Sequence, residues 1–206
     1  MNVAIIDYEG GNLTSVARAV SHLGFDCKIT RERKEILAAD KVIFPGVGAA
    51  GATMEALRRA GLVEILKNEL RERNVPCLGI CIGIQVLFEH SEEDDVPMLG
   101  ICPGKVVKFD AATGIRVPQI GWNRVSYEDP SHPFFAGVAE GEYFYFVNSY
   151  HVLPSMSSAV LGRTTYGCTS FASVVQVDNW WATQFHLEKS GKAGLRMLAN
   201  FLTQGQ

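Results

Sequence analysis

The segment of sequence that decides the fold is Cys77-Leu78-Gly79-Ile80-Cys81-Ile82-Gly83-Ile84-Gln85. A short apolar run meets a helical pattern there, and the junction has the form G-x-C-x-G, the thiol version of the nucleophile elbow. A sharp strand-to-helix turn leaves no room for side chains beside the nucleophile, so glycine occupies both flanking positions. The turn exposes the thiol at the carboxyl edge of a sheet, where amides at the start of the next helix stabilise a thiolate. The segment therefore predicts a strand, a helix and a reactive Cys81 between them.

Upstream of this segment, strand and helix patterns alternate. A continuous apolar run, as expected of a strand buried on both faces, lies at residues 3–6, and further strands are predicted at residues 25–30 and 41–44. Helical patterns cover residues 13–23, 31–39, 53–73 and, after the cysteine, 82–89. Parallel strands require crossover connections, so the alternation predicts an α/β fold with a central, mostly parallel sheet and helices on both faces.

Downstream of about residue 98 the pattern changes. Strand-like runs separated by turn signals lie at residues 106–109, 122–127, 143–147, 159–164, 171–177 and 180–185, followed by a last amphipathic helix at 192–202. The second half therefore adds antiparallel strands to the fold. Because a domain typically has roughly 100 to 200 residues, we expect residues 1–206 to form a single domain.

Composition and charge exclude several classes of protein. Hydrophobic residues make up 47% and charged residues 20% of the chain, which is typical of globular proteins and not of disordered chains. The net charge is 19 − 22 = −3 with no basic run, which argues against a nucleic-acid partner. No apolar stretch approaches the roughly 18 residues of a membrane span, and no basic leader opens the sequence. We therefore expect a cytoplasmic protein that does not contact membranes.

The five cysteines do not form C-x-x-C pairs, so neither a disulfide framework nor a zinc site is indicated. Besides Cys81, the simplest interpretation is that they are small core residues: Cys27, Cys77, Cys102 and Cys168. The sequence lacks a phosphate-binding loop, a dinucleotide-binding glycine motif after the first strand and an H-E-x-x-H metal motif. We therefore expect no cofactor and no metal.

A thiol nucleophile needs a base, and His186 is the best candidate. It follows the apolar run 180–185, and Glu188 comes two residues later, where it can accept the imidazole N–H and fix the tautomer. Taken alone, Cys81 could equally be an inert buried thiol and His186 a satisfied core histidine. Together, inside an α/β pattern, the three residues predict a Cys-His-Glu triad built from different strand ends of one sheet.

A second glycine-rich turn, Pro45-Gly46-Val47-Gly48, follows the run at 41–44. It could be an ordinary connection between a strand and a helix. If its strand neighbours that of Cys81, however, its backbone amides lie beside the thiol and complete an oxyanion hole with the N–H of Ile82.

Two motifs together resemble the signatures of the class I (triad) glutamine amidotransferases. Residues 79–85 resemble G-x-C-x-G-x-Q, and Gln184-Phe185-His186-Leu187-Glu188-Lys189-Ser190 resembles Q-F-H-P-E-x-S. Further segments are similar to the glutaminase subunits of imidazole glycerol phosphate synthases, from the first strand to the last helix: Asp7, Gly11-Asn12-Leu13, Pro45-Gly46-Val47-Gly48, Pro118-Gln119-Ile120-Gly121-Trp122-Asn123 and Tyr143-Phe144-Tyr145-Phe146-Val147. The resemblance implies the three-layer, flavodoxin-like fold of this family.

The resemblance also implies a reaction and a partner. The glutaminase subunit hydrolyses L-glutamine through a thioester on the cysteine, and the ammonia passes to a cyclase subunit, a (β/α)₈ barrel, in histidine biosynthesis. By position, the resemblance assigns catalysis to Cys81, His186 and Glu188, and the oxyanion hole to Val47, Gly48 and Ile82. The Val47 amide would join the oxyanion hole after its segment rearranges, when the partner has bound its own substrate. Gln85, Ser149 and Tyr150 would bind glutamine, and Asn12 and Trp122 would lie at the subunit interface.

Several residues depart from the family's usual pattern. Leu187 replaces a proline between His186 and Glu188, which removes a fixed φ and is expected to loosen Glu188. Asn148 stands where histidine is usual. These departures leave three alternatives open: a related glutaminase that feeds ammonia to another synthase, such as a sugar-amidating enzyme; a catalytically impaired interaction subunit; and a free-standing α/β thiol hydrolase.

Overall fold

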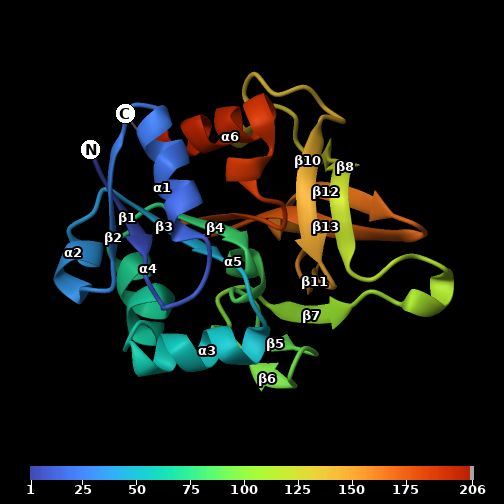
Figure 1. The fold of residues 1–206 in the computed structure, drawn as a ribbon, viewed down its shortest axis with the longest axis horizontal. Helices are drawn as coiled ribbons and strands as arrows, with labels where there is room; N and C mark the ends of the chain where they lie inside the picture. The colour runs from blue at the N-terminus through green and yellow to red at the C-terminus, as the bar shows by residue number, and fades with distance from the viewer. Residues whose placement is uncertain (205–206) are drawn as a thin grey trace.

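The computed structural model describes residues 1–204, and Figure 1 shows their arrangement. Over these residues the chain forms a twelve-stranded mixed sheet and a separate two-stranded ribbon. Helices cover both faces of the larger sheet (Figure 1): α1 (Leu13–His22) and α6 (Gly191–Thr203) pack on one face, and α2 (Arg33–Leu37) and α3 (Ala50–Arg59) on the other. The α/β class predicted from the alternation of patterns is confirmed.

The half of the sheet that carries the elbow is parallel. Its strand order is β2 (Asp26–Thr30), β1 (Asn2–Ile6), β3 (Lys41–Gly46), β4 (Cys77–Cys81) and β14 (Trp180–Thr183), and every neighbouring pair is parallel. The carboxyl ends of β3, β4 and β14 therefore meet at one edge. Strand β14 reaches this position from the far end of the sequence, which brings the C-terminal motif beside the elbow.

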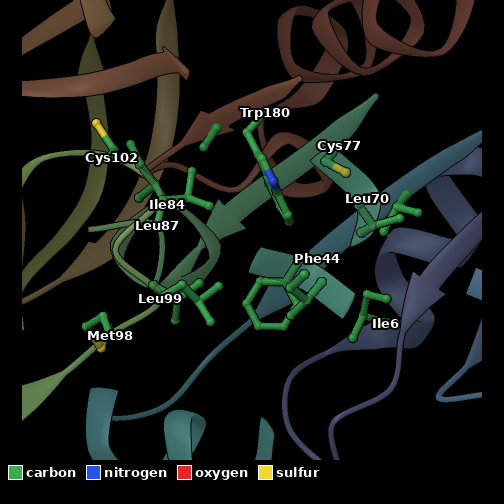
Figure 2. Close-up of a cluster of buried hydrophobic side chains, with 14 of the residues drawn as sticks. Ile6, Phe44, Leu70, Cys77, Ile84, Leu87, Met98, Leu99, Cys102 and Trp180 are labelled. Carbon is green, nitrogen blue, oxygen red and sulfur yellow. The ribbon is translucent and has the colours of Figure 1, made fainter. Parts of the chain in front are cut away.

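Side chains of the parallel strands alternate between two cores. In β3, Val42 and Phe44 face the core under α3, whereas Ile43 faces the core under α1 and α6. Figure 2 shows part of the first core, in which Phe44 lies among side chains from several elements, including Ile84 and Trp180. Burial on both faces explains why β1, β3 and β4 are largely apolar rather than alternating, whereas the edge strand β2 is mostly exposed.

The other half of the sheet is mostly antiparallel, as predicted for the C-terminal half of the chain. Strand β14 pairs with β13 (Thr169–Val177), which is followed by β11 (Tyr150–Pro154) and β7 (Gly104–Lys108). Strand β12 (Val160–Tyr166) pairs with β13, and three two-residue strands complete this half: β5 (His90–Ser91), β6 (Val96–Pro97) and β9 (Ser126–Tyr127). The two-stranded ribbon, made of β8 (Gln119–Arg124) and β10 (Tyr143–Asn148), is antiparallel and lies outside the large sheet.

One face of the β8–β10 ribbon is buried and the other is exposed. Phe144 packs on Phe185 with 4.2 Å between ring centroids, and both are completely buried. On the opposite face Ile120 is 64% exposed and Trp122 is 55% exposed. The ribbon thus packs on the segment that follows β14 with one face and presents an apolar surface with the other.

Some details of the prediction were wrong. The helix predicted over residues 53–73 is interrupted: α3 ends at Arg59, Gly61 adopts a φ of +67°, and a π-helical turn (Ile65–Glu69) precedes α4 (Leu70–Glu72). The helix predicted over 82–89 is only α5 (Ile82–Gln85), because N–H groups of residues 99–101 bond to the carbonyls of residues 86–88. Strand β11 was not predicted. Cys77 and Cys102 are buried as expected, but Cys168 is exposed at a turn.

Candidate active site

The turn at Cys81 has the strained backbone of a nucleophile elbow. Cys81 lies at φ 58° and ψ −106°, a conformation that non-glycine residues rarely adopt. A Cβ on Gly83 would come within 2.4 Å of the Phe44 carbonyl oxygen, and one on Gly79 within 2.5 Å of the Gly83 oxygen. Glycine is therefore required on both sides of the cysteine because β3, β4 and α5 approach one another closely. The reason for glycine predicted from the pattern is confirmed.

Strand register sets the neighbours of Cys81. Gly46 at the end of β3 pairs with Cys81, and Thr183 at the end of β14 pairs with Ile80. The residues after β14 consequently pass beside the thiol. Two of them are His186 and Glu188, and Nδ1 of His186 lies 2.9 Å from Oε1 of Glu188.

The backbone around His186 is tied to the β8–β10 ribbon. The His186 N–H donates to the Tyr145 carbonyl at 3.0 Å, and the Ser190 hydroxyl donates to the His186 carbonyl at 2.5 Å. Ser190 also accepts from the Tyr145 N–H at 3.0 Å. These bonds fix the backbone of His186 just before a short 3₁₀ turn, Leu187–Lys189, that leads into α6.

The electrostatics of His186 favour its protonated form. Burial alone would lower the pKa of His186, but interactions with Cys81 and Glu188 outweigh burial and raise this pKa to about 9. The imidazole therefore carries a proton near neutral pH, beside the sulfur.

Glu188 is held firmly. Its side chain is 2% exposed and bonded to the imidazole, so the loosening expected from Leu187 in place of proline is not observed. Leu187 is itself completely buried in the core under α6. Apolar packing of Leu187 fixes the turn where a proline would fix it through φ.

Cys81 and His186 line one cavity of about 260 Å³. This volume is somewhat below the roughly 300–1,000 Å³ of sites for drug-sized ligands, and it suits a molecule as small as an amino acid. Other residues predicted for the site line the same cavity: Val47, Gly48, Ile82, Gln85, Ser149 and Tyr150. The structure thus brings together the residues predicted for the site except Glu188, which lies behind His186, and the two interface residues.

The carbonyl of Tyr150 orients two amide side chains in this cavity. It accepts from Nε2 of Gln85 at 3.3 Å and from Nδ2 of Asn148 at 2.9 Å. A carbonyl can only accept, so both amides turn their NH₂ groups toward it. The Asn148 oxygen is buried without a hydrogen-bond partner, and Asn148 lines the cavity.

Sequence reasoning missed Glu93, which also lines the cavity. Its carboxylate accepts from the Ala50 N–H at the start of α3 at 2.8 Å, and burial raises the pKa of Glu93. The acidic run at residues 92–95 carries no motif, so nothing local marked Glu93. Only the approach of the β5–β6 turn to α3 places this carboxylate at the cavity.

The two predicted interface residues lie outside the cavity. Asn12 caps α1, with its side-chain oxygen accepting from the Ser15 N–H at 3.4 Å. Trp122 is on the exposed face of the β8–β10 ribbon, edge-on to Tyr145 at 5.9 Å between ring centroids. Both roles at an interface stay predictions.

Neither a metal cluster nor a membrane-crossing helix is found in the described part of the chain. Residues 1–204 contain no group of three or more His, Cys, Asp or Glu side chains placed to hold a metal ion. Within the same range no helix has both the length and the apolar character needed to cross a bilayer.

Comparison with known proteins identifies the family. The model of the class I glutamine amidotransferase family matches residues 4–204. The imidazole glycerol phosphate synthase subunit HisH of Chromobacterium violaceum is 48% identical over 210 residues, covering 98% of this chain and 97% of the relative. The HisH subunits of Dehalococcoides mccartyi and Acinetobacter baylyi are 46% and 42% identical, and each covers 97% of this chain, with 95% and 97% of the relatives covered.

Solved structures agree on the fold. A crystal structure of a glutamine amidotransferase superposes with a TM-score of 0.75 at 20% identity, covering 97% of this chain and 96% of the other. PurLQS from Thermotoga maritima gives a TM-score of 0.74 at 16% identity, covering 98% and 97%. The resemblance drawn from the two sequence motifs is confirmed, and this chain belongs to the class I glutamine amidotransferase family.

Proposed function

We propose that this chain is the glutaminase subunit of an imidazole glycerol phosphate synthase, and that Cys81, His186 and Glu188 are its catalytic triad. The observation that carries the proposal is the placement of a strained elbow cysteine and a carboxylate-bound histidine on one small cavity. Identities of 42–48% to HisH subunits over nearly the whole chain support the choice of synthase. The family match over residues 4–204 supports treating residues 1–206 as one amidotransferase domain.

The first half of the reaction forms a thioester. The Cys81 sulfur, with its proton held by His186, attacks the carboxamide carbon of L-glutamine, and the carbonyl oxygen becomes an oxyanion. The N–H groups of Ile82 and of Val47 or Gly48 stabilise that charge. His186 then gives its proton to the leaving nitrogen, the C–N bond breaks, and ammonia departs. Glu188 keeps the imidazole in the tautomer and orientation that these transfers need.

The second half regenerates the thiolate. His186, now neutral, takes a proton from water, and the hydroxide attacks the thioester carbon. The C–S bond breaks, glutamate leaves, and the sulfur and imidazole return to their starting state. No other reactant is required.

The polar groups of the cavity fit the backbone end of glutamine. Gln85, Asn148 and Glu93 supply oxygen acceptors, and an α-ammonium group offers three donors. Ser149 and Tyr150 line the same cavity, and we assign them to glutamine binding as well. Asn148, which departs from the family pattern, thus still contributes an acceptor.

The proposed partner is the cyclase subunit, a (β/α)₈ barrel that uses the ammonia to form imidazole glycerol phosphate and an aminoimidazole carboxamide ribotide in the cytoplasm. An exposed apolar patch, which consists of Ile120, Trp122, Tyr143 and Val147 on the β8–β10 ribbon, supports docking there. Val147 belongs both to this patch and to the cavity, so a docked partner would cover the route by which ammonia leaves.

The test compares glutamine hydrolysis by the wild-type chain and by Cys81→Ala, each measured with and without a cyclase that has bound its own substrate. We expect the variant to keep its far-ultraviolet circular dichroism and to lose glutamate formation, while wild type is slow alone and fast with the cyclase. Normal turnover by the variant would overturn the triad. Cyclase-independent turnover by wild type, or stimulation only by a sugar-amidating synthase, would overturn the assigned partner.

A further inference from the structure

The side-chain amide of Gln184 connects the glutamine-binding part of the cavity to the sulfur of Cys81. Its Oε1 accepts from Nε2 of Gln85 at 3.2 Å, and its Nε2 lies 4.0 Å from the Cys81 sulfur. Gln184 is completely buried. A buried amide of this kind is retained only where its polar atoms find partners.

The orientation of this amide follows from the network. The Tyr150 carbonyl can only accept, so the Gln85 atom that faces it is nitrogen. The same NH₂ group donates to Gln184, whose facing atom must therefore be oxygen. The remaining Gln184 atom is then NH₂, and it points toward the sulfur.

Strand register gives this arrangement its rigidity. Thr183 pairs with Ile80, which places Gln184 beside Cys81 on the side opposite Gly46. The Gln184 N–H donates to the Ser173 carbonyl of β13 at 2.9 Å, so its backbone is part of the sheet hydrogen bonding and not of a free loop.

The sulfur has groups of both kinds around it. The Val147 carbonyl, 3.9 Å away, is an acceptor and favours the protonated thiol. The Gln184 amide is a donor and favours the thiolate, as does the protonated imidazole of His186. A thiolate has no proton to donate to the Val147 carbonyl, but it can accept from Gln184 and His186. The balance between these neighbours therefore sets how readily the thiolate forms.

We propose that Gln184 is a thiolate-stabilising residue of this enzyme, whose NH₂ group donates to the Cys81 sulfur and whose orientation is set by Gln85 and the Tyr150 carbonyl. The inference rests on the proposed role of Cys81 as nucleophile. It assigns to Gln184 a contact with the reacting atom, and it couples the residues that hold glutamine to the charge on the sulfur.

Other ionisable groups also face Cys81, and a substitution at Gln184 removes none of them. They are His186 with Glu188 behind it, Tyr8 beyond the end of β1, and Glu93 and Tyr150 across the cavity. A substitution that removes the Gln184 amide therefore changes one donor to the Cys81 sulfur while the number of ionisable groups around the sulfur stays the same.

The experiment measures alkylation of Cys81 by iodoacetamide as a function of pH in wild type and in Gln184→Met, which keeps side-chain length and loses both polar atoms. Cys168, exposed at the turn between β12 and β13, serves as a reference thiol in the same sample. We expect the midpoint of the Cys81 profile to rise by about one pH unit in Gln184→Met, so that alkylation at pH 6 slows about tenfold. The matched control Gln176→Met changes a β13 glutamine that bonds to His132, and it leaves the profile unaltered.

The outcomes separate this inference from the proposed function. Cys81 that is alkylated no faster than Cys168 in wild type would contradict its role as nucleophile. Rapid alkylation in wild type with an unshifted profile in folded Gln184→Met would overturn the role of Gln184.

Should Gln184→Met not fold, the unsubstituted protein decides the question by nuclear magnetic resonance. One of the two Gln184 side-chain amide protons should move downfield as Cys81 deprotonates, because a donor to a thiolate is deshielded. Equal shifts of both protons would contradict the inference.

Discussion

Nδ1 of His186 bonds to Oε1 of Glu188 at 2.9 Å, with the two side chains only 4% and 2% exposed. His186 immediately precedes a 3₁₀ turn and Glu188 lies within it, so the chain itself brings the carboxylate to the imidazole. Burial removes competing water, which strengthens a charge-assisted bond of this kind. The second Glu188 oxygen, Oε2, is buried without a partner, so the hydrogen bonding of this carboxylate is concentrated on His186.

Replacement of this carboxylate tests its role. Glu188→Gln keeps the shape and the acceptor oxygen but removes the charge that stabilises the imidazolium. We expect kcat for glutamine hydrolysis in the presence of the cyclase to fall roughly 10²-fold with a small change in KM. Glu128→Gln, which breaks only the exposed pair with Arg163, is the matched control and should keep full activity. An unchanged kcat in Glu188→Gln would show that His186 needs no charged partner.

The raised pKa of His186 also predicts how stability depends on pH. A pKa of about 9 in the folded chain exceeds the unfolded value near 6.5, so folding binds a proton more tightly. The stabilisation is fully present below about pH 6.5 and disappears as the pH rises to about 9, with a loss on the order of 2 kcal/mol. Urea denaturation of wild type across pH 6 to 10 measures this loss.

To assign this loss to His186, the same urea denaturation is carried out on His186→Gln. The free energy of unfolding of this variant should lack this part of the pH dependence. In Glu188→Gln the folded pKa of His186 falls toward its unfolded value, so the loss should be smaller and should be complete at a lower pH. If wild type and His186→Gln show the same slope, the stabilising proton does not reside on His186.

The elbow glycines could be predicted from sequence because their requirement is steric and local. We expect Gly83→Ala to destabilise the fold by about 1–3 kcal/mol and to abolish activity, since its Cβ would push α5 and the Ile82 amide away from β3. Gly24→Ala is the control, because no atom lies within 4 Å of its Cβ and only its φ of +85° is strained. Thermal denaturation and glutaminase assays distinguish the two, and an active Gly83→Ala would refute the close packing of the elbow.

Much of the parallel half of the sheet could be predicted because continuous apolar runs indicate strands that are buried on both faces. The runs at residues 3–6, 41–44 and 77–80 give strands because their apolar side chains serve two cores. The interrupted helix over residues 53–73 was misjudged for a related reason. Leu57, Leu62 and Leu66 all face the same core, so their spacing looks continuous although the backbone turns at Gly61.

Without the family resemblance, which supplied Ser149 and Tyr150, the candidate site could be predicted only where one short motif carries both its geometry and its chemistry. Cys81, His186 and Glu188 belong to such motifs, whereas Glu93 and the amide network around Tyr150 depend on contacts between distant segments. Strand β11, which supplies the Tyr150 carbonyl, alternates imperfectly and was not recognised. Long-range register, rather than local propensity, therefore determines which side chains face the cavity.

Glu93 gives a sharp test of substrate recognition. If its carboxylate receives the α-ammonium group of glutamine, Glu93→Gln should raise KM about tenfold and leave kcat nearly unchanged, because the interaction is equal in the ground and transition states. The substituted amide can still accept from the Ala50 N–H, so stability should hardly change. Asp94→Asn is the matched control: Asp94 bonds to the next N–H of α3, that of Gly51, but does not line the cavity. Equal KM values for the two variants would argue against the recognition role.

The exposed face of the β8–β10 ribbon predicts how the partner binds. Trp122 is 55% exposed although large apolar side chains are usually buried, and Ile120 beside it is 64% exposed. Aromatic residues at the centre of an interface commonly contribute about 2 kcal/mol or more to binding. We therefore expect Trp122→Ala to weaken binding of the cyclase roughly 30-fold without a change in thermal stability.

Isothermal titration with the purified cyclase measures this effect, and Leu153→Ala serves as its control. Leu153 is 51% exposed but lies on β11, paired with Lys105 of β7 and outside the ribbon. Comparable losses of affinity in both variants would mean that exposed apolar area in general, and not this ribbon, drives association. A loss confined to Trp122→Ala, together with lost stimulation of glutamine hydrolysis, would place the partner over Val147, where the apolar patch and the cavity meet.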